Sequence, residues 1–123
     1  MLGRITAAAV DDTNKYLAVG TSQGEAKVIN LKSGGNLYDL VSCQQEISCL
    51  QFINGRTEFW LFGACWGGRL MMWTQPSEDN HFTVAAKCKI GHESDIIALD
   101  CTPFFVATGD DNGVVAVWNA FSG

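Results

Sequence analysis

Three stretches of nine residues in this chain align without a gap, and each ends on a glycine. They are Tyr16 to Gly24 (YLAVGTSQG), Trp60 to Gly68 (WLFGACWGG) and Phe105 to Gly113 (FVATGDDNG). Their final glycines lie 44 and then 45 residues apart. A constant spacing of this length is typical of repeat proteins, in which each supersecondary unit buries its apolar face against the next unit. The sequence therefore predicts an array of similar units, and such arrays bind partners more often than they catalyse reactions.

Each unit contains three short strands separated by turns, followed by a more exposed fourth segment. The predicted first strands are 5–10, 47–52 and 96–101, the second strands end near Gly20, Ala64 and Gly109, and the third strands are 25–30, 69–74 and 114–119. The turns before the third strands each end in Gly, which supplies the positive φ that a tight hairpin needs. Segments 36–41 and 81–88 are candidates for a fourth strand. No segment has a helical period of useful length, so we predict an all-β fold with four strands per repeat.

The composition indicates a globular chain with a substantial core. Hydrophobic residues make up 47% of the 123 residues and charged residues 17%, which disfavours disorder. The net charge of −5 and the scattered basic residues argue against binding to a nucleic-acid backbone. No stretch approaches the roughly 18 apolar residues of a membrane span, and the N-terminal apolar run is too short for a secretory signal.

The cysteines predict a reducing compartment. The five residues form an odd set without a CxxC motif, whereas a disulfide framework is normally even and accompanies secretion. Cys49 and Cys101 fall on first strands, where a small buried side chain is the ordinary interpretation. Cys65 lies in the second hairpin, and we expect it to be the accessible thiol.

Residues 91–119, GHESDIIALDCTPFFVATGDDNGVVAVWN, resemble a WD40 repeat. They combine a Gly-His pair, an apolar strand, a turn with Pro, a Thr-Gly step, an Asp-Asn-Gly hairpin and a closing Trp-Asn. WD40 repeats have about 40–45 residues and form the four-stranded blades of β-propellers. The resemblance covers nearly the whole chain as three repeats, 1–44, 45–90 and 91–123, and it is strongest in the last. It implies three propeller blades, the last of which lacks its outer strand.

The resemblance also implies a tetrad of hydrogen-bonding side chains that ties a blade together. In the third repeat these are Trp118, Thr108, His92 and Asn112, with Asn112 in the place where the family usually has Asp. A buried indole, hydroxyl and imidazole need such partners. The second repeat keeps only Trp73, with Gly63, Gly67 and Cys43 at the other positions, and the first has Val19, Gln23 and Ile29. The residues that close the third strands are thus Ile29, Trp73 and Trp118.

A propeller closes with about four to eight blades, whereas this sequence holds two complete units and a third that stops at Gly123. On its own it would expose apolar faces at both ends and an unpaired strand edge. We therefore expect a fragment of a larger closed propeller, with the remaining blades of the same protein as neighbours.

Structural roles explain His92 and the acidic hairpin 108–113 better than catalysis or metal binding does. The tetrad already gives His92 hydrogen-bond partners, and no convergent carboxylates or thiols accompany it. The hairpin resembles the opening of a calcium loop, yet Thr108 and Asn119 would occupy positions where Asp and a bidentate Glu are expected. The cysteines lack zinc spacing, and no nucleophile–base pair or phosphate-binding glycine loop is present. We predict no enzyme activity, no cofactor and no metal.

Trp66 is the residue that most suggests a binding surface. It lies in a hairpin turn with Arg69 close by, and an exposed Trp beside an Arg is typical of protein interfaces. The alternative is that Trp66 folds back over the neighbouring blade. Four acidic residues are expected on the same face, either as part of a partner-binding patch or as ordinary solvated surface: Glu93, Asp95, Asp110 and Asp111.

Two functions remain open. The third unit, with GHESDI, a Cys-x-Pro step, Ala-Thr-Gly, Trp-Asn and a closing Ser-Gly, is most similar to repeats of cilium- and flagellum-associated WD-repeat proteins. That similarity implies a non-enzymatic interaction scaffold in a large intracellular assembly, such as the axoneme and its microtubule-associated proteins. The alternative is a regulatory adaptor or peptide-reader propeller, for example a substrate receptor, in the cytosol or nucleus. Both imply protein partners, and neither involves nucleic acid or a membrane.

Overall fold

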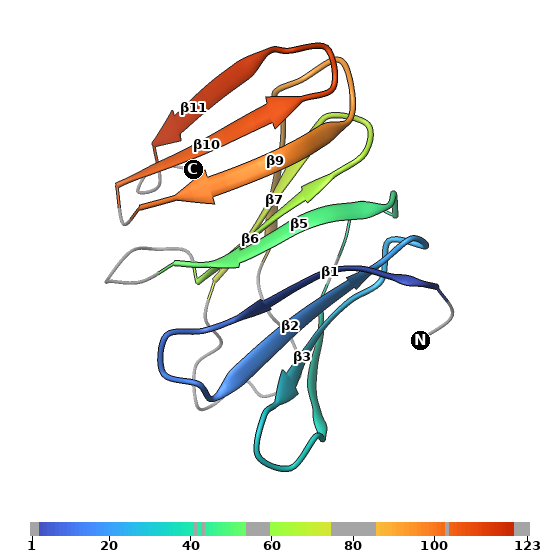
Figure 1. Cartoon of the computed structure of the whole chain (residues 1–123), viewed down its shortest axis with the longest axis vertical. Helices are drawn as coiled ribbons and strands as arrows, with labels where there is room; N and C mark the ends of the chain where they lie inside the picture. Colours follow the sequence, from blue (N-terminus) through green and yellow to red (C-terminus); the bar gives the residue numbers. More distant parts are fainter. Residues whose placement is uncertain are drawn as a thin grey trace.

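Figure 1 shows the computed structural model, a fan of antiparallel β-strands. It describes residues 3–40, 42, 44–53, 60–74, 86–102 and 104–119. The strands in these ranges are β1 (Ile5–Val10), β2 (Tyr16–Thr21), β3 (Ala26–Asn30), β4 (Asn36–Leu40), β5 (Ile47–Phe52), β6 (Leu61–Cys65), β7 (Arg69–Trp73), β8 (Ala86–Ile90), β9 (Ile96–Cys101), β10 (Phe105–Asp110) and β11 (Val115–Asn119). Among the described residues there is no helix long and apolar enough to cross a membrane.

The strands form three antiparallel sheets, each with its strands in chain order. The first sheet contains β1 to β4, the second β5 to β8, and the third β9 to β11. The sequence predicted this all-β fold of four-stranded repeats, with three strands in the last. The fourth strand of the second sheet is an exception to the predicted boundaries: β8 runs Ala86–Ile90 instead of 81–88, and residues 81–85 lie outside the described part. The later position lets β8 pair with β7 along its whole length, from Trp73 opposite Ala86 to Arg69 opposite Ile90.

The three sheets are copies of one another down to the strand register. Ile29, Trp73 and Trp118 occupy the same position on the third strand of each sheet. They pair with Leu17, Leu61 and Val106 on the second strands. Trp73 is fully buried, whereas Ile29 and Trp118, in the two outer sheets, are half-buried.

The sheets stand side by side with their first strands adjacent, so that β5 lies between β1 and β9 (Figure 1). A hydroxyl bridges each of these junctions at the same position. The Thr6 side chain donates to the carbonyl of Ile47 at 2.5 Å, and the Ser48 side chain donates to the carbonyl of Ile96 at 2.5 Å. Because Ile47 and Ile96 each begin a first strand, one contact geometry is used twice.

The hydrophobic core lies between the sheets and forms two clusters. In the first cluster, Ala18, Ala26, Val28 and Leu40 of the first sheet pack against apolar residues of the second, including Leu61 and Trp73. In the second cluster, Phe62, Leu70 and Met72 of the second sheet pack toward Val106 of the third. Trp60 anchors the first junction through an edge-to-face contact with Tyr16, with ring centroids 5.3 Å apart. Burial between neighbours therefore stabilises each sheet, as expected for a repeat array.

Candidate interaction surface

A chain of buried hydrogen bonds holds the third sheet to the loop that precedes it. The Trp118 indole N–H donates to the Thr108 hydroxyl at 3.1 Å, and that hydroxyl lies 2.6 Å from Nε2 of His92. Nδ1 of His92 lies 2.9 Å from the Asp110 carboxylate. Since an ionised carboxylate can only accept, Nδ1 donates to Asp110. The polar atoms of His92 are thus fully used in structure, as the resemblance implied for His92, Thr108 and Trp118.

The fourth member of this tetrad is Asp110, and the assignment to Asn112 is wrong. Asp110 ends β10 with its side chain in the sheet interface, whereas Asn112 lies two residues further on, at the exposed apex of the turn. Asn112 contributes its backbone N–H, which donates to Oδ1 of Asp110 at 2.9 Å, and the Val114 N–H does the same at 2.9 Å. Asp110 was also a candidate partner-binding residue, and its burial removes it from the surface.

Asp110 is held in its ionised form. The Val114 N–H lowers the pKa of Asp110 below its ordinary value of 3.8, burial opposes this, and hydrogen bonds from His92 and Asn112 add to the lowering. A carboxylate that accepts several N–H donors is stabilised in its charged state. The tetrad therefore has a charge-assisted end, supplied by Asp110 in place of Asn112.

The position equivalent to Asp110 is occupied by Thr21 in the first sheet and Cys65 in the second. The Thr21 hydroxyl takes over the turn-capping role, because it accepts from the N–H groups of Gln23 at 3.3 Å and Glu25 at 3.1 Å. Cys65 is fully buried and disulfide-bonded, so the prediction of an accessible thiol there is wrong. As the last residue of β6, Cys65 points into the first junction.

Glycine is needed at two places around His92 because other atoms occupy the space of a side chain. A Cβ on Gly91 would overlap the Trp118 ring, and a Cβ on Gly68 would overlap the His92 carbonyl. Lys89 covers the same indole, with Nζ 5.8 Å from the ring centroid. The Gly-His pair of the sequence is therefore a packing requirement.

The hairpin turns of the three sheets are anchored in the same way, which places them along one edge of the molecule. In each sheet the residue after the second strand donates its N–H to the carbonyl just before the first strand: Ser22 to Arg4 at 2.8 Å, Trp66 to Glu46 at 2.9 Å and Asp111 to Asp95 at 3.1 Å. Asp95 also accepts the Gly67 N–H through its carboxylate at 2.7 Å. The second hairpin and the third are thus linked through Asp95 at this edge.

Trp66 projects from this edge and is 40% exposed, so it does not fold back over the neighbouring sheet. Arg69, Glu93 and Asp111 are also exposed, and Asp95 is half-buried. Asp111 is hydrogen-bonded to the Ser94 hydroxyl. We call Trp66, Arg69, Glu93, Asp95 and Asp111 the rim surface.

The remaining candidates for chemistry are occupied in structural roles. Thr108 and Asp110 both bond to His92, so their oxygens face the sheet interface and do not converge with Asn119 on a calcium position. Among the described residues, no three His, Cys, Asp or Glu side chains form a metal-binding group. Burial raises the pKa of Cys49 above its ordinary value, and burial together with the Asp100 charge raises the pKa of Cys101 to about 11. At neutral pH both thiols are protonated and poorly nucleophilic.

Solved structures share this arrangement over nearly the whole chain. The structure of U3-55K superposes with a TM-score of 0.78 at 23% identity, over 94% of this chain and 34% of that one. The crystal structure of RRP9 WD40 repeats gives a TM-score of 0.78 at 23% identity, over 94% of this chain and 33% of that one. The crystal structure of the mitotic checkpoint complex contains a chain that superposes with a TM-score of 0.79 at 13% identity, over 96% and 36% of the two chains. The three sheets have the fold of WD40 propeller blades.

A sequence relative is also similar over nearly the whole chain. The periodic tryptophan protein 2 homolog of Mus musculus is 27% identical over 121 residues, which make up 97% of this chain and 12% of that protein. No protein-family model matches the chain. The chain thus spans about an eighth of that relative and about a third of the solved chains, so their other parts have no counterpart in these blades.

Proposed function

We propose that these three blades belong to a non-enzymatic WD40-repeat scaffold that holds other proteins in a large assembly, with the rim surface as a contact site. The observation that carries the proposal is the exposed Trp66 on an edge built from equivalent turns, of which the second is hydrogen-bonded to the third blade through Asp95. A rigid aromatic side chain beside an Arg is the composition of an interface hot spot. A surface supported by strands and linked turns also loses little conformational freedom when a partner binds.

The buried groups support a binding role over a catalytic one. His92, Thr108 and Asp110 are consumed by hydrogen bonds within the third blade, and the half-buried thiols of Cys49 and Cys101 are protonated. A general base or nucleophile must reach a substrate, and none of these groups does so. The described blades offer a contact surface.

Replacement of Trp66 by Ala in the full-length protein tests the proposal. We expect the Trp66→Ala protein to keep its melting temperature and to lose affinity for its assembly by about 1–3 kcal/mol, about 5- to 150-fold. Quantitative co-purification from cells measures the loss. Phe104→Ala is the matched control, because Phe104 is an exposed aromatic residue in the turn at the opposite edge. Equal retention of the assembly by both variants would rule out the rim surface as the contact.

A ciliary version of the proposal rests on the sequence similarity of the third repeat to cilium- and flagellum-associated repeats. It assigns the protein to the cytoplasm and the axoneme, with microtubule-associated proteins as partners. Fractionation of ciliated cells tests it: the protein should stay with the axonemal microtubules after a high-salt wash. Release as a free monomer by salt would refute the axonemal assignment, and it would leave the rim surface open to test by Trp66→Ala.

A regulatory adaptor is the second candidate, and the exposure of Trp66 is the observation that favours it. An adaptor captures a short peptide on the free propeller, whereas a scaffold is extracted only with its complex. Peptide-array screening of the purified full-length protein distinguishes the two. A peptide whose affinity falls by at least about tenfold with Trp66→Ala would support the adaptor.

A further inference from the structure

A shallow hollow of about 240 Å³ lies on the first blade, at the edge opposite the rim surface. It is lined by Lys15, Tyr16, Asn30 and Lys32, and we call it the lysine hollow. Tyr16 and Asn30 pair with each other where β2 begins and β3 ends. The two lysines lie beside this pair, in the β1–β2 turn and the β3–β4 turn (Figure 1). Residues from two separate turns therefore meet in one hollow.

The walls of the lysine hollow are fixed by contacts within the fold. The Leu31 N–H donates to the Lys15 carbonyl at 3.0 Å, which joins the two turns. The Tyr16 ring packs edge-to-face on Trp60 of the second blade. A site with such fixed walls loses little conformational freedom when a ligand binds.

The Asn30 carboxamide is oriented by its own turn. Its Oδ1 accepts the N–H groups of Lys32 at 2.9 Å and Ser33 at 3.2 Å. The oxygen is thus used within the turn, and the NH₂ group keeps two donors. Within the described ranges, no residue accepts a hydrogen bond from this NH₂ group. Asn30 therefore offers only donors to a ligand in the hollow.

The two lysines are available to a ligand. Lys27, on the same blade, pairs with Asp39 at 3.2 Å, whereas no described carboxylate forms an ion pair with Lys15 or Lys32. Both side chains are exposed. The lysine hollow thus combines two positive charges with the amide donors and has no negative charge in its lining.

Two carboxylates precede Lys15 in its turn, and neither lines the hollow. Asp11 is buried, and one of its oxygens accepts the N–H groups of Lys15 and Tyr16, both at 2.9 Å. Its other oxygen accepts from the Thr13 hydroxyl. Asp12 is exposed. The Asp11 charge is therefore already stabilised by donors of its own turn.

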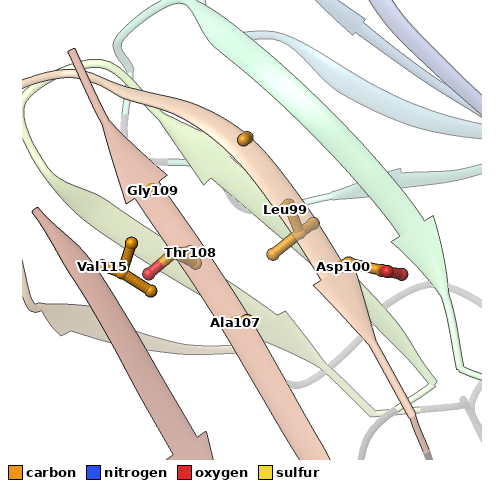
Figure 2. A pocket seen from close by; sticks show the side chains of 7 residues that line it. Leu99, Asp100, Ala107, Thr108, Gly109 and Val115 are labelled. Atoms are coloured by element: carbon orange, nitrogen blue, oxygen red, sulfur yellow. The ribbon is translucent and has the colours of Figure 1, made fainter. Parts of the chain in front are cut away.

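A second hollow, of about 260 Å³, has different chemistry. It lies on the third blade, and apolar residues such as Leu99 and Val115 line most of it (Figure 2). Its charged lining residue is Asp100, which is acidic. Of these two hollows, only the lysine hollow can neutralise an anion.

We propose that the lysine hollow binds a phosphate monoester on a serine or threonine side chain of a partner protein. Such a group carries about −1.5 to −2 charges at pH 7 and accepts hydrogen bonds through three oxygens. Two ammonium groups match that charge, and the Asn30 NH₂ group can donate to a further oxygen. A single carboxylate would match only one of the two lysines.

The surroundings of the hollow favour a phosphate on a protein over other sources. A nucleic-acid strand needs a run of basic residues, and Lys15 and Lys32 are the only described basic residues at this edge. A free phosphate ion gains little at exposed lysines, because water screens the interaction. Flanking residues of a partner add contacts that a free ion lacks. The inference does not depend on the rim surface.

Asn30→Asp in the full-length protein separates anion binding from the stability of the turn. The new carboxylate still accepts the N–H groups of Lys32 and Ser33, but it replaces the NH₂ donors by a negative charge. Retention on an immobilised, degenerate library of phosphoserine and phosphothreonine peptides should fall at least about tenfold. Lys32→Gln should weaken retention without touching the turn cap. Lys27→Gln, which removes the same charge from an ion pair of the same blade, is the matched control and should be retained like the unmodified protein.

Three outcomes would overturn the proposal. The first is equal retention on phosphorylated and unphosphorylated libraries, or equal retention of Asn30→Asp, Lys32→Gln and Lys27→Gln. The second is competition by inorganic phosphate at lower concentration than by the phosphopeptides, which would show a site for the free ion. The third is binding to poly(U) RNA that is lost in Asn30→Asp. Trp66→Ala should leave retention on the phosphopeptide library unchanged, so this site and the rim surface are tested separately.

Discussion

The carboxylate of Asp110 joins two features that the sequence presents separately, the hairpin turn and the buried histidine. Oδ1 accepts the turn N–H groups of Asn112 and Val114, while Oδ2 faces Nδ1 of His92. The contacts then run from the Trp118 indole through Thr108 and His92 to Asp110. Chains of this kind are strong only while every member is satisfied.

The lowered pKa of Asp110 makes stability depend on pH. Because its folded pKa lies below the ordinary value of 3.8, its contribution is complete above pH 3.8 and is lost as the pH falls through the folded pKa. Urea unfolding between pH 6 and about pH 2.5 should therefore show the unfolding free energy falling on acidification. Asp110→Asn should be less stable at pH 6 and should lose part of that pH dependence. An unchanged acid slope in Asp110→Asn would contradict the assigned role.

The Thr108 hydroxyl contacts both the Trp118 indole and the His92 ring. We therefore expect the hydroxyl to contribute more to stability than the methyl group. Thr108→Val keeps the shape but leaves the Trp118 N–H and Nε2 of His92 without their partner. It should cost about 1–3 kcal/mol in chemical unfolding. Thr108→Ser retains the hydroxyl and is the matched control, with a smaller loss. A larger loss for Ser than for Val would show that packing dominates at this position.

At the scale of the hairpin, the three turns share a backbone conformation and differ in what lies against them. Gly24, Gly68 and Gly113 all have positive φ, at 80°, 77° and 86°. Gly68 is also covered by the loop that carries His92, so the turn of the second blade supports the tetrad of the third.

Gly68 is required both for its positive φ and for the close approach of the His92 carbonyl, and substitutions can separate these two effects. Gly34, in the turn between β3 and β4, has a φ of 74° and nothing within 4 Å of an added Cβ. Gly34→Ala should therefore cost only the left-handed strain of about 1–2 kcal/mol. Gly68→Ala adds a clash with the His92 carbonyl and should be clearly more destabilising in thermal unfolding. Similar losses of stability for the two variants would mean that the loop carrying His92 moves away from the added methyl group at little cost.

Most strand positions could be predicted from the sequence because hairpin glycines fix both the turns and the register of the strands beside them. β1, β5 and β9 occupy the predicted 5–10, 47–52 and 96–101. The fourth strands have no such marker, and β8 is displaced from its predicted position as a result. Its place is set by pairing along β7, which is a tertiary constraint.

The fourth member of the tetrad could not be predicted from the family pattern, although the internal repeat contained a signal for it. The family pattern pointed to Asn112, but alignment of the nine-residue stretches places Thr21, Cys65 and Asp110 in one column at the end of the second strand. Cys65 packs in the first junction and Asp110 contacts His92, whereas Thr21 is covered by its own blade, where its hydroxyl bonds to Glu25. Cys65 is buried and Trp66 is exposed because β6 ends at Cys65 and Trp66 already belongs to the turn.

At the scale of the molecule, the second blade is the only one of the three with described neighbours on both faces. Fully buried large residues concentrate there, with Trp73, Phe62, Leu61 and Leu70 as examples. Ile5 of the first blade and Val115 of the third are exposed at the two ends of the array. In a repeat array, stability is a sum of intrinsic and neighbour terms, so the middle blade receives two neighbour terms and each outer blade receives one.

Hydrogen exchange of the 123-residue chain should therefore rank the blades. Amides of β6 and β7 should exchange most slowly, and those of β11 should exchange at least about tenfold faster, since sub-global opening of the third blade exposes them without disturbing the first junction. Mass spectrometry of strand-sized peptides measures the ranking. Ser48→Ala removes the hydroxyl that bridges β5 to β9 and should speed exchange in the third blade while leaving β2 and β3 unchanged. Thr6→Val, at the equivalent position of the first junction, should have the converse effect. Equal protection in all three blades would show that the array opens as one unit, with coupling between neighbours that exceeds the stability of any single blade.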